Sequence, residues 1–141
     1  MKECVLSLKD LQYDEPELHI ELQASNGDTS ATQDFYCYVE DLEQFANELI
    51  DFPSSITSEV RFEIGRRSSD WAYFVLVRTY VHDGWGHSAL EIDLDCHAKA
   101  PYGHSMHFYI LCEPASVNRL GKELIVWCRN RESPLEWYPS A

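Results

Sequence analysis

The chain has 141 residues and a formal net charge of −13, from 24 aspartates and glutamates against 11 lysines and arginines. This excess of negative charge repels phosphate backbones, which argues against nucleic-acid binding and favours a basic protein partner. Hydrophobic residues make up 45% of the chain, which excludes disorder as its main content and allows a single domain over residues 1–141.

The five cysteines predict free thiols in a reducing cytoplasm. Their number is odd and no C-x-x-C spacing occurs, so neither a disulfide framework nor a zinc ribbon is indicated. The longest apolar run, residues 71–77, is too short to cross a bilayer, and the N-terminus lacks the apolar core of a signal peptide. We therefore expect a cytoplasmic protein with no membrane partner.

Three strands are expected before the first helix. Residues 4–8 alternate in part, residues 17–24 alternate apolar and polar side chains without a fault, and residues 33–39 follow the same pattern. A period of two is typical of a half-buried strand. This pattern places Tyr36 and Tyr38 on the outer face.

A helix is expected to open at Asp41. Its carboxylate can cap the free N–H groups of the first turn, and Gln44 completes a capping-box pattern. Apolar side chains repeat at helical spacing up to Ile50, and Pro53 ends the helix because it cannot donate the next backbone hydrogen bond. Residues 59–64 alternate again and predict another strand.

A central hairpin is expected from residues 71–81 and 87–96, joined by a glycine-containing turn. If His82 faces His87 across the tip, Arg78 faces Glu91 across the two strands. Independent apolar pairs on the other side of the sheet agree with this register. Residues 105–112 predict the last strand.

Pro114 suits the first turn of a second helix, because its missing N–H is not needed there. Gly121 lies on or beside the apolar stripe of this helix and predicts a close approach to the sheet. Residues 130–141 form a C-terminal tail in which Trp137 and Tyr138 can fold back. The elements together predict an α+β fold: a single curved, mostly antiparallel sheet of about seven strands, in the order three strands, helix, four strands, helix, with two helices packed on one face.

The hairpin register turns acidic and aromatic side chains toward the sheet face opposite the helices. The residues expected to contact a partner there are Tyr80, Glu91, Asp93, Asp95 and Tyr109. Four residues of the first strands are expected to join them on the same face: His19, Glu21, Tyr36 and Tyr38. Aromatic rings supply contact area and carboxylates steer a basic partner, so the pattern predicts a protein-binding surface. A homodimer through this face, or its cover by the chain's own tail, would explain the same pattern.

The histidines offer a catalytic alternative. His82 and His87, beside Asp83, are the candidate ligands of a divalent metal, although no third ligand with matching spacing is visible. His107 can face Asp95 across the last two strands, a pair suited to acid–base catalysis. A small metal-dependent or acid–base hydrolase using His82, His87, Asp95 and His107 is thus the alternative function. Ordinary strand-end histidines and surface charge pairs account for the same residues, and we expect no cofactor.

Three features of the chain occur together: the order of strands and helices, the turn at residues 80–90 with its D-x-x-G-H spacing, and Glu113-Pro114 followed by LGKEL at residues 120–124. In these features, which cover about its second half, the chain resembles small bacterial proteins that include WapI-type immunity proteins. The resemblance implies a cytoplasmic protein that binds and neutralises a toxin domain made by the same cell. It carries no catalytic residue across. The expected function is therefore that of a non-enzymatic protein-binding domain.

Overall fold

The computed structural model describes residues 3–12, 17–68 and 70–139. Within these residues the chain forms two helices and eight strands, an α+β fold. The elements in chain order are β1 (Cys4–Gln12), β2 (Glu17–Asn26), β3 (Ser30–Tyr38), α1 (Val39–Ile50), β4 (Glu59–Gly65), β5 (Tyr73–Val81), β6 (Ser88–Cys96), β7 (His104–Cys112), α2 (Pro114–Arg129) and β8 (Leu135–Trp137).

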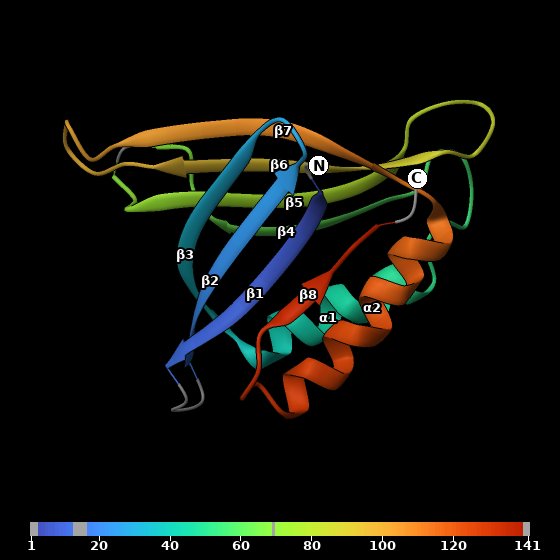
Figure 1. Cartoon of the computed structure of the whole chain (residues 1–141), viewed down its shortest axis with the longest axis horizontal. Helices are drawn as coiled ribbons and strands as arrows, with labels where there is room; N and C mark the ends of the chain where they lie inside the picture. The colour runs from blue at the N-terminus through green and yellow to red at the C-terminus, as the bar shows by residue number, and fades with distance from the viewer. Residues whose placement is uncertain (1–2, 13–16, 69, 140–141) are drawn as a thin grey trace.

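The strands form two antiparallel sheets, where a single sheet was expected. One sheet has the strand order β3-β2-β1-β8 and the other β4-β5-β6-β7, and their strands cross at a large angle (Figure 1). Among the described strands β3 does not pair with β4, because α1 takes the chain out of the first sheet between them. Alternation along a strand shows which side chains point inward but not which strand lies beside it, so it could not reveal this division.

The C-terminal tail completes the first sheet. Leu135 pairs with Leu8 and Trp137 pairs with Leu6, so β8 extends the sheet beyond β1. The Trp137 side chain is fully buried, and its indole N–H donates a hydrogen bond to the carbonyl oxygen of Ser116 at 2.9 Å. The prediction that Trp137 folds back is confirmed, although three residues are too few for alternation to predict a strand.

The first helix begins two residues earlier than expected. Val39 is its first residue, so Asp41 lies in the first turn instead of preceding it. The Asp41 carboxylate accepts a hydrogen bond from the backbone N–H of Tyr38 at 2.9 Å. An acidic residue therefore still satisfies a donor at the helix start, but from inside the helix, which the spacing of apolar residues alone could not distinguish.

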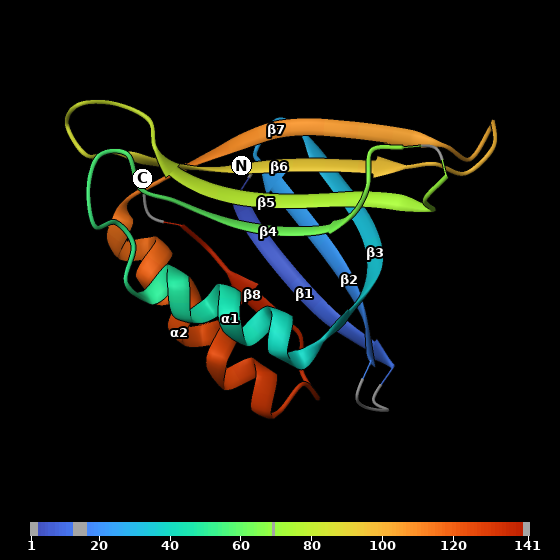
Figure 2. The ribbon, with the colours of Figure 1, turned by 180° about the vertical axis from the view of Figure 1, so that it is seen from behind.

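The two helices lie side by side (Figures 1 and 2). Gly121 of α2 allows this contact, since a Cβ atom there would lie 2.7 Å from the carbonyl oxygen of Ala46 in α1. Asn118 donates from its side-chain amide to the carbonyl oxygens of Leu49 and Phe52 at the end of α1. The close approach predicted for Gly121 is therefore real, but its neighbour is α1 and not the sheet.

A common core lies between the sheets and the helices. It combines the inward side chains of both sheets with the apolar stripes of α1 and α2, and the helices lie on the side where β4 and β8 are the outermost strands (Figure 2). Each sheet consequently keeps an outer face away from the helices, so the molecule has two such faces where one was expected. Neither helix in the described part of the chain is long and apolar enough to cross a membrane.

Candidate functional site

The outer face of the sheet β4-β5-β6-β7 carries the five residues expected to contact a partner. Arg78 pairs with Glu91 across β5 and β6, which confirms the predicted register of the central hairpin. Glu91 also pairs with Tyr109 on β7, and Tyr80 pairs with Ala89. Because paired residues point to the same side of a sheet, Tyr80, Glu91 and Tyr109 share this face with Asp93 and Asp95.

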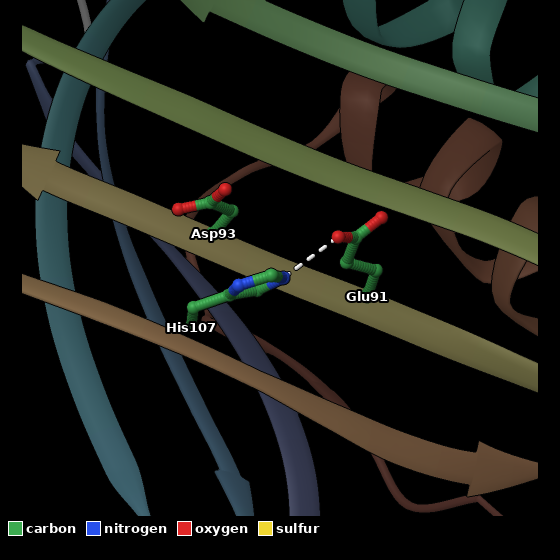
Figure 3. Close-up of side chains that lie close together, drawn as sticks. All are labelled: Glu91, Asp93 and His107. Carbon is green, nitrogen blue, oxygen red and sulfur yellow. Dashed lines mark hydrogen bonds and ion pairs between the residues drawn. The ribbon is translucent and has the colours of Figure 1, made fainter. Parts of the chain in front are cut away.

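Glu91 is held in an ion-paired network near the middle of this face. Only 8% of the residue is exposed. Its Oε1 accepts a hydrogen bond from the Arg78 guanidinium at 2.5 Å, and its Oε2 lies 2.7 Å from Nε2 of His107 (Figure 3). Burial acts to raise the pKa of the Glu91 carboxyl, but the bonds from Arg78 and His107 outweigh it and hold the pKa below its usual value. Glu91 is therefore a paired carboxylate, unable to steer a distant partner strongly.

Asp93, one step along β6 on the same face, is paired in a similar way. It is 6% exposed and accepts a hydrogen bond from Nη2 of Arg67 at 2.6 Å. The same guanidinium stacks over the Phe74 ring at 4.4 Å, and that of Arg78 lies 4.1 Å from the Tyr80 ring centre. Arginines of β5 and of the β4–β5 connection thus cover the acidic strand with the chain's own positive charge.

The predicted pair of His107 with Asp95 is wrong. His107 lies opposite Asp93 and bonds to Glu91, whereas Asp95 lies opposite Ser105 and forms an ion pair with His97 at 3.1 Å. The expected register is off by two residues. Such a shift leaves every side chain on the same face, so alternation cannot detect it, and the path of the β6–β7 connection decides it.

The cluster of Glu91, Asp93 and His107 is the one arrangement, among the described residues, that brings three potential metal ligands together. One ligand atom from each residue lies within 4.8 Å of the others. Carboxylate and imidazole ligands suit Zn²⁺ or a similar divalent ion. The guanidinium groups of Arg78 and Arg67 already neutralise both carboxylates, however, so a cation would have to displace one of them and then lie beside the other.

The metal ligands expected at the hairpin tip have a different arrangement. The rings of His82 and His87 lie 6.2 Å apart and face each other, and Nδ1 of His87 is 2.6 Å from the Asp83 carboxylate. Asp83 also accepts backbone N–H bonds from Trp85 and His87, which organise the turn. The hydrogen bond from His87 is the main reason why the pKa of Asp83 falls to about 2. The tip is an ion-paired turn, and metal binding by His82 and His87 stays a prediction.

The four residues of the alternative hydrolase are not brought together. His82 and His87 lie at the tip of the hairpin, next to the pair of Ser88 with Cys112. His107 lies opposite Asp93, five residues further along the sheet, or about 17 Å at the usual rise of a strand. General acid–base catalysis requires its groups within hydrogen-bonding reach of one substrate, so these four residues cannot act as one site in this arrangement.

The aromatic residues of the first strands lie on the outer face of the other sheet, contrary to the expected single surface. His19 stacks on Tyr36 at 4.2 Å between ring centres, and its Nε2 is 2.7 Å from the Asp34 carboxylate. Tyr36 and Tyr38 are exposed. The expected acidic–aromatic surface is thus two surfaces on two sheets.

The two surfaces differ in charge. No lysine or arginine occurs between Lys9 and Arg61, and this stretch contains 13 aspartates and glutamates, whereas the rest of the chain has 11 acidic and 11 basic residues. The whole formal charge of −13 therefore falls on residues 10–60. Within the described residues, this stretch contains the end of β1, then β2, β3 and α1, the connection to β4 and the first two residues of β4. The net charge of the whole chain does not reveal this concentration, which appears only when the charged residues are followed along the sequence.

The comparisons with known proteins give a fold and no family. No family model and no curated protein matches the chain. A solved structure of the plant transcriptional regulator PBF-2 is similar, with a TM-score of 0.51 and 11% identity, over 90% of this chain and 74% of that one. At that identity the likeness concerns the fold alone, and the resemblance to WapI-type immunity proteins stays a prediction.

Proposed function

We propose that the chain is a non-enzymatic protein-binding domain whose partner is a basic protein. The observation that carries this proposal is the confinement of the net charge to residues 10–60. Charge spread evenly over the surface would serve solubility, whereas charge gathered on adjoining elements creates a field that attracts a positively charged partner to that part of the molecule.

The proposed docking surface, called the acidic surface below, consists of the outer face of β2 and β3 and the exposed side of α1. Tyr36 and Tyr38 are its aromatic residues, and Glu40 and Glu48 are exposed on the helix. The helix follows β3 without a connecting loop, so Tyr38 and Glu40 are close neighbours. Rings at such a place supply contact area while the carboxylates orient the partner.

The resemblance to WapI-type immunity proteins suggests what the partner is. A basic toxin domain made by the same cell would be attracted to the acidic surface, and fast association would protect the cell. Glu91 and Asp93, the carboxylates expected at first to make this contact, are less suited to it because Arg78 and Arg67 already neutralise them.

The test is a measurement of association rates with basic toxin domains encoded in the same genome, using lysozyme as a basic protein without a toxin's recognition surface. We expect one toxin domain to bind, and the double variant Glu40→Lys, Glu48→Lys to slow its association by about tenfold at low salt and by less at high salt. The dissociation rate should change little, since these charges act mainly on encounter.

The control is Asp70→Lys with Glu132→Lys, two exposed carboxylates outside residues 10–60 and away from the helix α1. It changes the total charge by the same amount, so a purely global effect would slow association equally in both double variants. Equal slowing, or no toxin domain that binds more tightly than lysozyme, would remove the proposal.

A further inference from the structure

The outer face of the sheet β4-β5-β6-β7 has an exposed apolar corner beside the hairpin tip. Leu111 is 62% exposed and Tyr109 is 42% exposed, both on β7. The Tyr109 ring meets the Tyr80 ring edge-on, with 6.4 Å between the ring centres. Ala89 on β6 pairs with Tyr80 on one side and with Leu111 on the other. Trp85 in the turn is 87% exposed. Large exposed apolar and aromatic side chains gathered in this way are typical of a protein–protein contact.

Each carboxylate on this face is paired with an arginine or a histidine, unlike most of those on the acidic surface. Glu91 is neutralised by Arg78 and His107, and Asp93 by Arg67. Arg78 also contacts Glu59 at 3.3 Å. A second copy of this chain carries the same −13, so two copies repel each other wherever β2, β3 and α1 meet. The face with paired charges is the region where two copies can approach with less of that repulsion.

The edge of this sheet is covered, which directs a second copy to the face. The side-chain amide of Asn26, at the end of β2, donates a hydrogen bond to the backbone carbonyl of Tyr109 at 3.2 Å. A second β7 strand therefore cannot extend the sheet by continuous edge pairing at this position. The outward-pointing side chains of β7 remain accessible.

The area of the face is sufficient for a modest dimer. Four strands, the central ones nine residues long, span about 19 Å by about 30 Å at the usual strand spacing and rise. Covering this area buries about 550 Å² per copy, or about 1,100 Å² in total, slightly above the lower limit for a specific interface. A reversible dimer with a micromolar dissociation constant fits such an area.

We propose that two copies of this chain associate face to face through the sheet β4-β5-β6-β7, about a two-fold axis, with Tyr109 and Leu111 among the residues buried in the contact. This inference does not rest on the proposed function. It leaves the acidic surface of each copy free, so a dimer would present two docking surfaces for a basic partner.

Sedimentation velocity on the full chain, up to about 200 µM, tests the proposal. We expect the wild-type chain to shift from monomer to dimer with concentration, and Leu111→Lys to weaken the dimer at least about tenfold because the charge would be buried between two copies. Val126→Lys is the matched control, since Val126 is 66% exposed on α2, outside this face, and the substitution adds the same charge. It should leave the dimer unchanged.

Salt separates this contact from a charge-driven one. Raising NaCl from about 50 to about 500 mM should strengthen the dimer, because it screens the repulsion between the two acidic segments. If thermal unfolding shows that Leu111→Lys does not fold, Trp85→Ser, which lies outside the strands, takes its place in the same experiment. A wild-type chain that stays monomeric at about 200 µM, or equal weakening by Val126→Lys and Leu111→Lys, would overturn the proposal. Dimerisation without toxin binding would leave it standing while the proposed function fails.

Discussion

The outer faces of the two sheets contain the same kinds of residue and differ in what those residues touch. On the outer face of the sheet that contains β6, the Glu91 and Asp93 carboxylates are buried and accept hydrogen bonds from arginines. On β2, β3 and α1 the acidic residues lie in a stretch without any lysine or arginine, and the aromatic rings of Tyr36 and Tyr38 are exposed. An acidic–aromatic composition is thus compatible with a self-contained ion network and with an open docking surface.

The difference has a physical origin in the position of the arginines. Arg78 lies on β5 and Arg67 lies on the connection between β4 and β5, so their long side chains reach the carboxylates of β6. A carboxylate under such a cover exchanges water for a guanidinium, and its charge is nearly cancelled at a distance. The stretch between Lys9 and Arg61 supplies no lysine or arginine of its own. Asp10 and Glu59 are paired with Arg131 and Arg78, but exposed carboxylates such as Glu40 and Glu48 on α1 act on the surroundings.

The largest effect is expected from breaking the network at Glu91. Glu91→Gln would leave the partly buried Arg78 guanidinium with only the exposed Glu59 as counter-charge, and we expect the free energy of unfolding to fall by about 2–3 kcal/mol. Urea unfolding measures this loss. Glu48→Gln on the exposed side of α1 makes the same chemical change and should cost no more than about 0.5 kcal/mol. Equal losses for the two variants would mean that the faces do not differ as described.

A smaller effect is expected at the edge of the same network. Arg67→Ala removes the guanidinium that stacks on Phe74 and that pairs with the Asp93 carboxylate. Because the Arg67 side chain is largely exposed, we expect the free energy of unfolding to fall by only about 1–2 kcal/mol. Arg66→Ala is the control, since its guanidinium lies 5.5 Å from the Trp71 ring centre at the exposed end of the sheet. If urea unfolding gives the same small loss for both variants, Arg67 does not cover Asp93 in solution.

The smallest effect concerns the hairpin tip. The hydrogen bond with Asp83 raises the pKa of His87 above its usual 6.5, and the pKa of Asp83 is lowered from 3.8 to about 2, mainly by His87. The contribution of His87 to stability is therefore complete below pH 6.5 and lost as pH rises through its raised pKa. That of Asp83 is complete above pH 3.8 and lost as pH falls toward 2.

An NMR titration of the His87 ring measures this pair directly. We expect its midpoint above 6.5 in the wild-type chain and back near 6.5 in Asp83→Asn. His97, whose pKa is raised by its hydrogen bond to the carbonyl oxygen of Trp71, serves as the internal reference and should keep the same midpoint in the variant. A wild-type His87 midpoint at or below 6.5 would show that the ion pair does not form in solution.

Much of the fold could be predicted from local patterns. The alternation of residues 17–24 identified the inward side chains of β2, and the opposite charges of Arg78 and Glu91 selected the register of the central hairpin, which the structure confirms. Both predictions concern neighbours joined by a short turn or by the period of a strand, where the chain leaves few alternatives. Pro114 marked the start of α2 for the same local reason.

The candidate site was predicted less well. Tyr80, Glu91, Asp93, Asp95 and Tyr109 do share a face, but apart from Arg78 opposite Glu91 their partners were missed. Arg67 reaches Asp93 across 26 positions of sequence, and His107 contacts Glu91 where Asp95 was expected. Neither contact follows from a repeating pattern, because each depends on how the connections before β5 and before β7 fold.

Residue order alone determined the period of each strand, the amphipathic stripes of the helices and the confinement of charge to residues 10–60, since these depend on spacing and composition along the chain. The tertiary structure decided that β3 and β4 belong to different sheets, that β8 pairs with β1 and that arginines cover the β6 carboxylates. The reason is that a strand has the same periodicity whichever strand lies beside it, whereas its neighbours are chosen by the packing of the whole core.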